Sequence, residues 1–191
     1  MANPDAESTA NVQKALRYLS KTAGLGLSYS PSSDIVLEGY SDADHGGDGP
    51  TMRSTTGYVF LVHGCPVSWR SQLQRTVAGS TTESEYMALY ETAREALWIR
   101  NFLTELGMEQ KGPTPLYCDN TAAEKIANNP AAFGKSKSFD LKYQFTRERV
   151  RLGQLTVNRV DSANNLADVF TKMLPRNKLE EIRSQLGVCG P

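Results

Sequence analysis

The sequence has 191 residues, a formal net charge of zero and 39% hydrophobic residues, which is typical of one globular domain with a real core. This composition excludes a disordered chain. Between residues 135 and 183, eleven Lys or Arg face six Asp or Glu. This basic third is compatible with a polyanionic partner, and equally with solvated helix surfaces.

The three cysteines, Cys65, Cys118 and Cys189, are odd in number and have no paired short spacing. They predict neither a disulfide framework nor a zinc site, and they fit a reducing compartment. No apolar run approaches the length of a membrane span, and the first residues lack the basic and apolar regions of a signal peptide. We therefore expect an intracellular, soluble protein.

The first predicted element is a short amphipathic helix. Apolar residues recur at helical spacing over residues 8–22, and Gly24 follows as a stop signal. The turn-rich stretch 30–33 is typical of a boundary, so we expect the compact domain to begin near Asp34. The expected division is an N-terminal helix and connector at 1–33, a main domain at 34–174, and a C-terminal helix and tail at 175–191.

The stretch 36–44 predicts a strand that carries two acids, Asp42 and Asp44, to its C-terminal end. The glycine-rich stretch 45–50 is expected to be a loop. Two further strands are predicted at residues 55–63 and 67–71. Three successive strands on short connections predict an antiparallel meander.

The longest predicted helix covers residues 83–106. Ser80 and Glu83 predict a capping box at its start, and Gly107 is expected to end it. At about 100° per residue, Glu85 lies at the edge of the apolar face, from which its carboxylate could reach the sheet.

A short strand at 114–119 ends on Asp119. A strand that follows a long helix is usually parallel to the earlier strand through a right-handed crossover, so Asp119 is expected at the same end of the sheet as Asp42. The remaining predicted elements are helices at 121–129, 139–152, 163–174 and 178–186, and a strand at 154–160.

Acids at the ends of adjacent parallel strands, joined by one from the long helix, suit a two-metal nuclease, because Mg²⁺ prefers hard oxygen ligands. Each acid also has a structural explanation: Asp44 as a loop acid, Asp119 as an N-cap, and Glu85 as a first-turn residue favoured by the helix dipole. Asp168 lies opposite the apolar face of its predicted helix, which favours a surface position. Only the joint arrangement favours chemistry, and the pattern does not choose between Asp42 and Asp44.

Several ordered motifs then resemble one family. They are Gly39-Tyr40-Ser41-Asp42-Ala43-Asp44, Ser54-Thr55-Thr56-Gly57-Tyr58-Val59-Phe60, Ser68-Trp69, Ser80-Thr81-Thr82-Glu83-Ser84-Glu85-Tyr86-Met87-Ala88-Leu89, Cys118-Asp119-Asn120, and Leu166-Ala167-Asp168 with Thr171-Lys172. Over about residues 16–186 the chain resembles the ribonuclease H domain of copia-type LTR retrotransposon Pol polyproteins. The resemblance implies an α/β, RNase H-like fold with a five-stranded mixed sheet of order 3-2-1-4-5 and helices on both faces.

The same resemblance implies catalytic and metal-binding roles for four acids, Asp42, Glu85, Asp119 and Asp168. It thereby selects Asp42 over Asp44 and includes Asp168. The implied cofactor is two Mg²⁺ ions, for which Mn²⁺ can substitute. The implied function is hydrolysis of the RNA strand of RNA/DNA hybrids, giving a 5′-phosphate and a 3′-hydroxyl, during reverse transcription. The implied partners are the hybrid and the reverse transcriptase domain of the same polyprotein. The N-terminal segment is expected on the polymerase side, and no membrane partner is implied. The implied location is the cytoplasm, within virus-like particles.

The sequence departs from related patterns in two places. Many copia-type sequences carry histidines where this chain has Ser138 and Gln144. Cellular ribonucleases H have a histidine in the loop before the last acid, whereas residues 161–164 contain none. Ser138 and Gln144 do not stand at metal-ligand positions in the fold, so these departures do not exclude activity. The missing loop histidine, thought to help the product leave, puts that role in doubt here.

A hybrid differs from DNA in its 2′-hydroxyls and helix shape, so small polar groups near the metals and cations along the backbone are expected. The polar candidates, which can also cap helices, are Ser80, Thr81, Thr82, Asn120 and Thr121; the cationic candidates are Arg70, Arg75, Lys135, Lys137 and Arg147. The main alternative is a catalytically silent domain that binds hybrid or supports a polymerase. A strand-transfer integrase is disfavoured because its motif has three acids.

Overall fold

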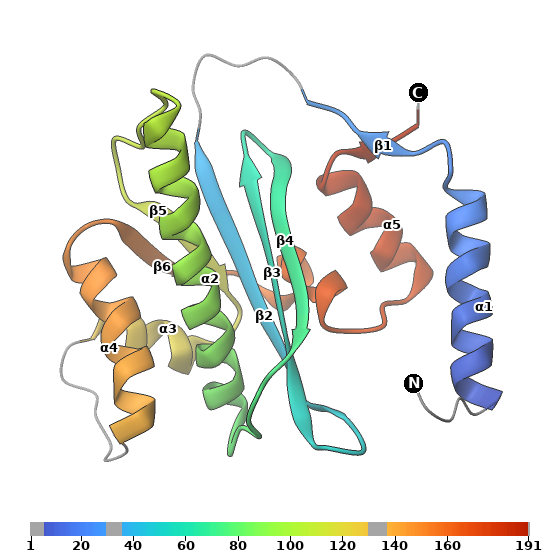
Figure 1. Ribbon diagram of the computed structural model, residues 1–191, viewed down its shortest axis with the longest axis horizontal. Coiled ribbons are helices and arrows are strands. Elements are labelled where there is room, and N and C mark those ends of the chain that lie inside the picture. The colour runs from blue at the N-terminus through green and yellow to red at the C-terminus, as the bar shows by residue number, and fades with distance from the viewer. Residues whose placement is uncertain (1–5, 30–35, 130–136, 191) are drawn as a thin grey trace.

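A mixed five-stranded sheet lies at the centre of the protein in the computed structural model, which describes residues 6–29, 36–129 and 137–190 (Figure 1). The strands are β2 (Leu37–Asp48), β3 (Arg53–Val62), β4 (Cys65–Leu73), β5 (Thr114–Cys118) and β6 (Leu155–Arg159). They lie in the order β4-β3-β2-β5-β6. β2, β3 and β4 form an antiparallel meander, and β5 is parallel to both β2 and β6. With the short β1 set aside, this is the predicted order 3-2-1-4-5.

Helices cover both faces of this sheet (Figure 1). α2 (Thr81–Glu105), α3 (Thr121–Asn128) and α4 (Lys137–Arg151) lie on one face, and α5 (Arg176–Gln185) lies on the other. Alternate side chains of β3 pack on opposite faces of the sheet. Tyr58 and Phe60 belong to the hydrophobic core under α2 and α3, whereas Val59 and Leu61 pack with Ile182 of α5. Burial on both faces explains why β3 is a continuous apolar run.

The two ends of the described chain lie on the α5 side (Figure 1). α1 (Ala6–Lys21) is the predicted first helix, and β1 (Gly26–Leu27) pairs antiparallel with β7 (Val188–Cys189). α5 buries Ile182 against the main sheet. The division of the chain near residues 34 and 175 is still a prediction.

β2 continues through residues 45–48, so the prediction of a loop there is wrong. The Asp44 carboxylate accepts a hydrogen bond from the Thr55 N–H, and the register shifts between Asp44 and Asp48. A Cβ at Gly47 would collide with the Asp44 carboxylate. The glycine therefore makes room for the half-buried Asp44 side chain in an irregular strand, where the composition alone indicates a loop.

The prediction of one α-helix at 163–174 is also wrong. The segment forms two 3-10 turns, η1 (Ser162–Asn164) and η2 (Leu166–Phe170). Between them the Asn165 side chain accepts from the Ala167 N–H at 3.1 Å and donates to the Ser41 carbonyl at 3.0 Å. The asparagine thus starts a new turn and ties it to β2, which interrupts a continuous helix.

α2 begins at Thr81 and forms only half of the predicted capping box. The Ser80 hydroxyl accepts from the Glu83 N–H at 3.1 Å, but the Glu83 carboxylate accepts from the Gly79 N–H at 2.8 Å. α2 is long enough to span a bilayer and too polar to do so; across the described part of the chain, no helix combines the necessary length and apolar character.

Candidate active site

Three acids from three elements meet at one end of the sheet. Asp42 lies in β2, Asp119 directly follows β5, and Glu85 lies in the first turns of α2. One carboxylate oxygen from each lies within 4.8 Å of the other two. Among the described residues, this is the one group of three acidic, His or Cys side chains close enough to hold a metal ion. The prediction that Asp42 and Asp119 share one end of the sheet is confirmed, because β2 and β5 are parallel.

Asp42 is fully buried and is held from the opposite direction by residues that follow η2. Thr171 Oγ1 donates to its Oδ2, and Lys172 Nζ lies 3.1 Å from its Oδ1. Gly57 is the partner of Asp42 in β3, and a Cβ there would lie 2.6 Å from Thr171 Cγ2. The missing side chain therefore lets this segment approach Asp42. Burial raises the pKa of Asp42, against the opposing effects of Thr171 and Lys172.

Glu85 is the most strongly perturbed acid of the group. Burial raises its pKa to about 9, and the nearby charges of Asp42 and Asp119 add to the shift. The backbone N–H of Ala43 donates to this carboxyl group and opposes the shift. Its Oε2 is buried and has no hydrogen-bond partner among the described residues. A crowded set of hard oxygen donors with one unsatisfied oxygen fits a divalent cation.

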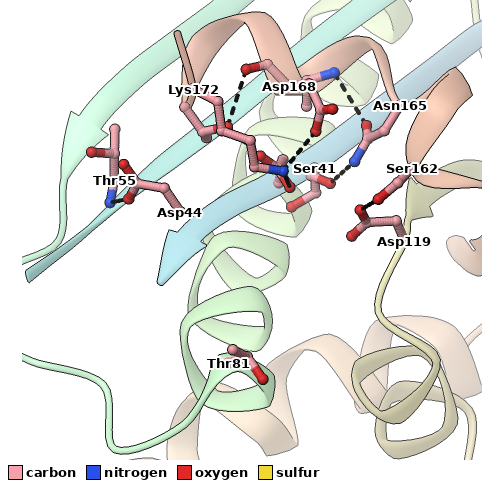
Figure 2. Close-up of polar contacts among 12 residues, drawn as sticks. Ser41, Asp44, Thr55, Thr81, Asp119, Ser162, Asn165, Asp168 and Lys172 are labelled. Carbon is pink, nitrogen blue, oxygen red and sulfur yellow. Dashed lines mark hydrogen bonds and ion pairs between the residues drawn. The ribbon is translucent and has the colours of Figure 1, made fainter. Parts of the chain in front are cut away.

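Asp168 reaches the site because its segment is a 3-10 helix. Such a helix repeats every three residues, so Asn165, Asp168 and Thr171 face the same way, toward β2. Asp168 is buried, and its Oδ1 lies 2.9 Å from the Nζ of Lys172 (Figure 2). The α-helical reading pointed this acid to the surface; the structure places it beside Asp42, to which Lys172 links it.

Asp119 is the half-buried member of the group, and it accepts a hydrogen bond from the Ser162 hydroxyl of η1 (Figure 2). No role was predicted for Ser162, Asn165 or Lys172. Two signals could have indicated Lys172: its place in the Thr171-Lys172 motif and its i,i+4 spacing from Asp168. The contacts of Ser162 with Asp119 and of Asn165 with Ser41 join residues far apart in the chain, so no local sequence pattern predicts them.

The polar residues predicted to contact the hybrid lie at the starts of two helices, where Figure 2 shows Thr81 apart from the labelled acids. Ser80 caps α2, and Thr81 and Thr82 form its first turn. Asn120 caps α3, because its Oδ1 accepts from the N–H groups of Ala122 at 3.0 Å and Ala123 at 2.9 Å. Thr121 is half-buried at the start of the same helix. The capping explanation therefore holds for Ser80 and Asn120, and a role in binding stays a prediction.

The predicted cations divide into two groups. Arg70 and Arg75 line a hollow of about 480 Å³ together with Arg94 of α2 and Lys142 of α4. Thr56 of β3 lines the same hollow. It pairs with Ala43 of β2, the residue after Asp42. Arg147 is elsewhere, where its guanidinium donates to the Asn129 carbonyl at 2.8 Å. Lys135 and the side chain of Lys137 lie outside the described residues.

Two plant transposon proteins match nearly the whole chain. The Retrovirus-related Pol polyprotein from transposon TNT 1-94 of Nicotiana tabacum is 40% identical over 188 residues, which are 98% of this chain and 14% of that protein. The protein from transposon RE1 of Arabidopsis thaliana is 36% identical over 188 residues, 98% of this chain and 13% of that protein. The chain is related to the Pol polyproteins of copia-type retrotransposons. It spans about one seventh of their length, and no family model matches it.

Solved structures show that the chain has the ribonuclease H fold. The LC11-RNase H1 structure in complex with RNA/DNA hybrid has a TM-score of 0.52 at 12% identity, over 71% of this chain and 93% of that chain. The Prototype Foamy Virus Protease-Reverse Transcriptase has a TM-score of 0.51 at 16% identity, over 76% of this chain and 22% of that chain. The predicted fold class is confirmed.

Proposed function

We propose that this chain is a metal-dependent endonuclease that hydrolyses the RNA strand of RNA/DNA hybrids during reverse transcription of a retroelement, giving a 5′-phosphate and a 3′-hydroxyl. One observation carries the proposal: oxygens of Asp42, Glu85 and Asp119 lie within 4.8 Å of one another, and Glu85 Oε2 is buried without a partner. Crowding acids in this way opposes their ionisation unless cations compensate for the charge.

The residues that would hold the metal are Asp42, Glu85, Asp119 and Asp168, with Mg²⁺ as the ion and Mn²⁺ as a substitute. When bound, the ions supply an activated water and stabilise the leaving oxygen. Because burial and its acidic neighbours raise the pKa of Glu85 to about 9, this carboxyl group holds a proton at neutral pH in the metal-free protein. Metal binding therefore releases that proton, and the affinity for metal should increase as the pH rises toward 9.

The hollow between β4, α2 and α4 supports a polyanionic substrate. Four cations, Arg70, Arg75, Arg94 and Lys142, line it together with one acid, Glu91. Such cations bind phosphates without reading the base sequence. Thr82 and Asn120, at the starts of α2 and α3, are the candidates for reading the 2′-hydroxyls of the RNA strand. The reverse transcriptase domain of the same polyprotein is the proposed partner of the N-terminal segment, in cytoplasmic virus-like particles.

The test is cleavage of a labelled RNA/DNA hybrid in Mg²⁺, beside duplex DNA and duplex RNA. Asp42→Asn and Asp119→Asn should abolish cleavage and leave hybrid binding within a few fold, because they remove ligand charge but no phosphate contact. Asp44→Asn is the matched control: it lies in the same strand, and its amide oxygen can still accept from the Thr55 N–H. The control should cleave like the wild type.

A silent hybrid-binding domain is the competing function, and the same assay separates the two. Hybrid binding without Mg²⁺-dependent cleavage by the wild type would favour the silent domain. Cleavage by Asp42→Asn at the wild-type rate would remove Asp42 from the active site.

A further inference from the structure

Lys172 places a cation inside the acidic site. Its Nζ lies 2.9 Å from Asp168 Oδ1 (Figure 2). The same Nζ lies 3.1 Å from Asp42 Oδ1, so one ammonium group bridges two carboxylates. The Asp42 side chain is 0% exposed and the Asp168 side chain 11%, whereas Lys172 is 38% exposed. The lysine thus reaches the buried acids from the solvent side.

The bridge separates the four acids into two cation positions that share Asp42. Asp42, Glu85 and Asp119 form the first position, with their oxygens within 4.8 Å of one another. Asp168 is outside that group, and it meets Asp42 through Lys172. Both oxygens of Asp42 are engaged from this second side, since Thr171 donates to Oδ2 while Lys172 contacts Oδ1.

We propose that Lys172 is a built-in competitor of the second metal ion: its ammonium group holds the Asp42–Asp168 pair, and a divalent cation binds there only as Lys172 withdraws. The inference rests on the proposed function and adds a residue that sets the affinity for one ion of the two. The first position differs in that one of its oxygens, Glu85 Oε2, has no hydrogen-bond partner among the described residues.

The chemistry of lysine suits this exchange. An ammonium group is a compact charge on a flexible stem of four carbons, and it makes no rigid bidentate contact with a carboxylate. Because Lys172 is partly exposed, it can move its charge into water without crossing the core. A divalent ion brings twice the charge to the same two carboxylates. In the metal-free protein, Lys172 limits the repulsion between Asp42 and Asp168.

The test is calorimetric titration of Mn²⁺ into the wild type, Lys172→Gln, and the control Lys125→Gln, which makes the same charge change at an exposed position of α3. The wild type and the control should bind one ion tightly and a second ion more weakly. Lys172→Gln should bind the second ion about tenfold more tightly, with the first affinity little changed. Its metal-free unfolding midpoint should fall below that of the wild type, and saturating Mn²⁺ should abolish the difference.

A second variant keeps the proposal testable if Lys172→Gln fails to fold. Lys172→Arg retains the charge and can grip both carboxylates with a rigid fork, so it should bind the second ion more weakly than the wild type. Unchanged or weaker second-ion binding by Lys172→Gln, or stronger binding by Lys172→Arg, would overturn the inference and leave the proposed function standing. No Mn²⁺ or Mg²⁺ binding by the wild type would refute the proposed function itself.

Discussion

Replacing Glu85 by Gln tests the electrostatic cost of the site in the absence of metal. Burial, with Asp42 and Asp119, raises the pKa of Glu85 from 4.5 to about 9. Between these two values the folded protein binds a proton that the unfolded chain releases, so the free energy of unfolding decreases as the pH rises. Glu85→Gln has nearly the same size and no such titration.

The magnitude follows from the distance to neutral pH. Between pH 4.5, the ordinary pKa of a Glu, and pH 7, the free energy of unfolding falls by about 1.4 kcal/mol per pH unit. The total loss at pH 7 is about 3 kcal/mol. The metal-free variant should therefore be more stable than the wild type at pH 7 by up to about 3 kcal/mol. For a chain of this length that corresponds to roughly 6 to 12 °C in melting temperature. Near pH 5 the two proteins should differ little.

Urea denaturation in EDTA at several values between pH 5 and 8 measures the effect. Glu91→Gln is the matched control, because Glu91 lies on the same helix in a surface ion pair with Arg94, whose contribution is small. In the metal-free protein at pH 7, Glu91→Gln should show no comparable gain in stability over the wild type. Mg²⁺ should stabilise the wild type more than Glu85→Gln. A difference between wild type and Glu85→Gln that stays constant from pH 5 to pH 8 would refute the assignment of a strongly raised pKa.

Three other perturbations test the support of the site and its substrate contacts. Gly57→Ala should destabilise the protein by about 1–3 kcal/mol and weaken Mn²⁺ binding, because a Cβ there meets Thr171 and the Ala167 carbonyl; Gly112→Ala, with open space around it, should do neither in the same melts and titrations. Asn165→Ala should cost about 1–3 kcal/mol in urea denaturation, since it leaves the Ser41 carbonyl without its donor; a loss below 0.5 kcal/mol, the lower edge of ordinary hydrogen-bond effects, would contradict this. Thr82→Ala should weaken binding of hybrid relative to DNA duplex by about 1 kcal/mol, whereas Arg75→Ala should weaken both equally and reduce the salt dependence; equal losses for both variants on both duplexes would argue against Thr82 as a reader of RNA.

The sheet and two of the acids could be predicted because their signals are local. The apolar runs and short connections of β2, β3 and β4 indicate a meander. The long helix before β5 then makes that strand parallel to β2, which brings Asp42 and Asp119 to one end. The strength of the Glu85 perturbation could not be predicted, because it depends on how deeply the packed structure buries the carboxyl group.

The segment after β6 could not be predicted because contacts far along the chain decide its shape. A helical pattern assumes 3.6 residues per turn, and on that assumption Asp168 points away from the core. The Asn165 side chain instead bonds to the Ser41 carbonyl, 124 residues away in the sequence, and Thr171 bonds to Asp42, 129 residues away. These two anchors lie on the three-residue repeat of η2, and Asp168 lies midway between them, so the same repeat turns it toward β2. Lys172 comes directly after Thr171, and its ammonium group contacts both Asp42 and Asp168. The shape of η2 therefore decides both whether the fourth acid joins the other three and which cation stands between them.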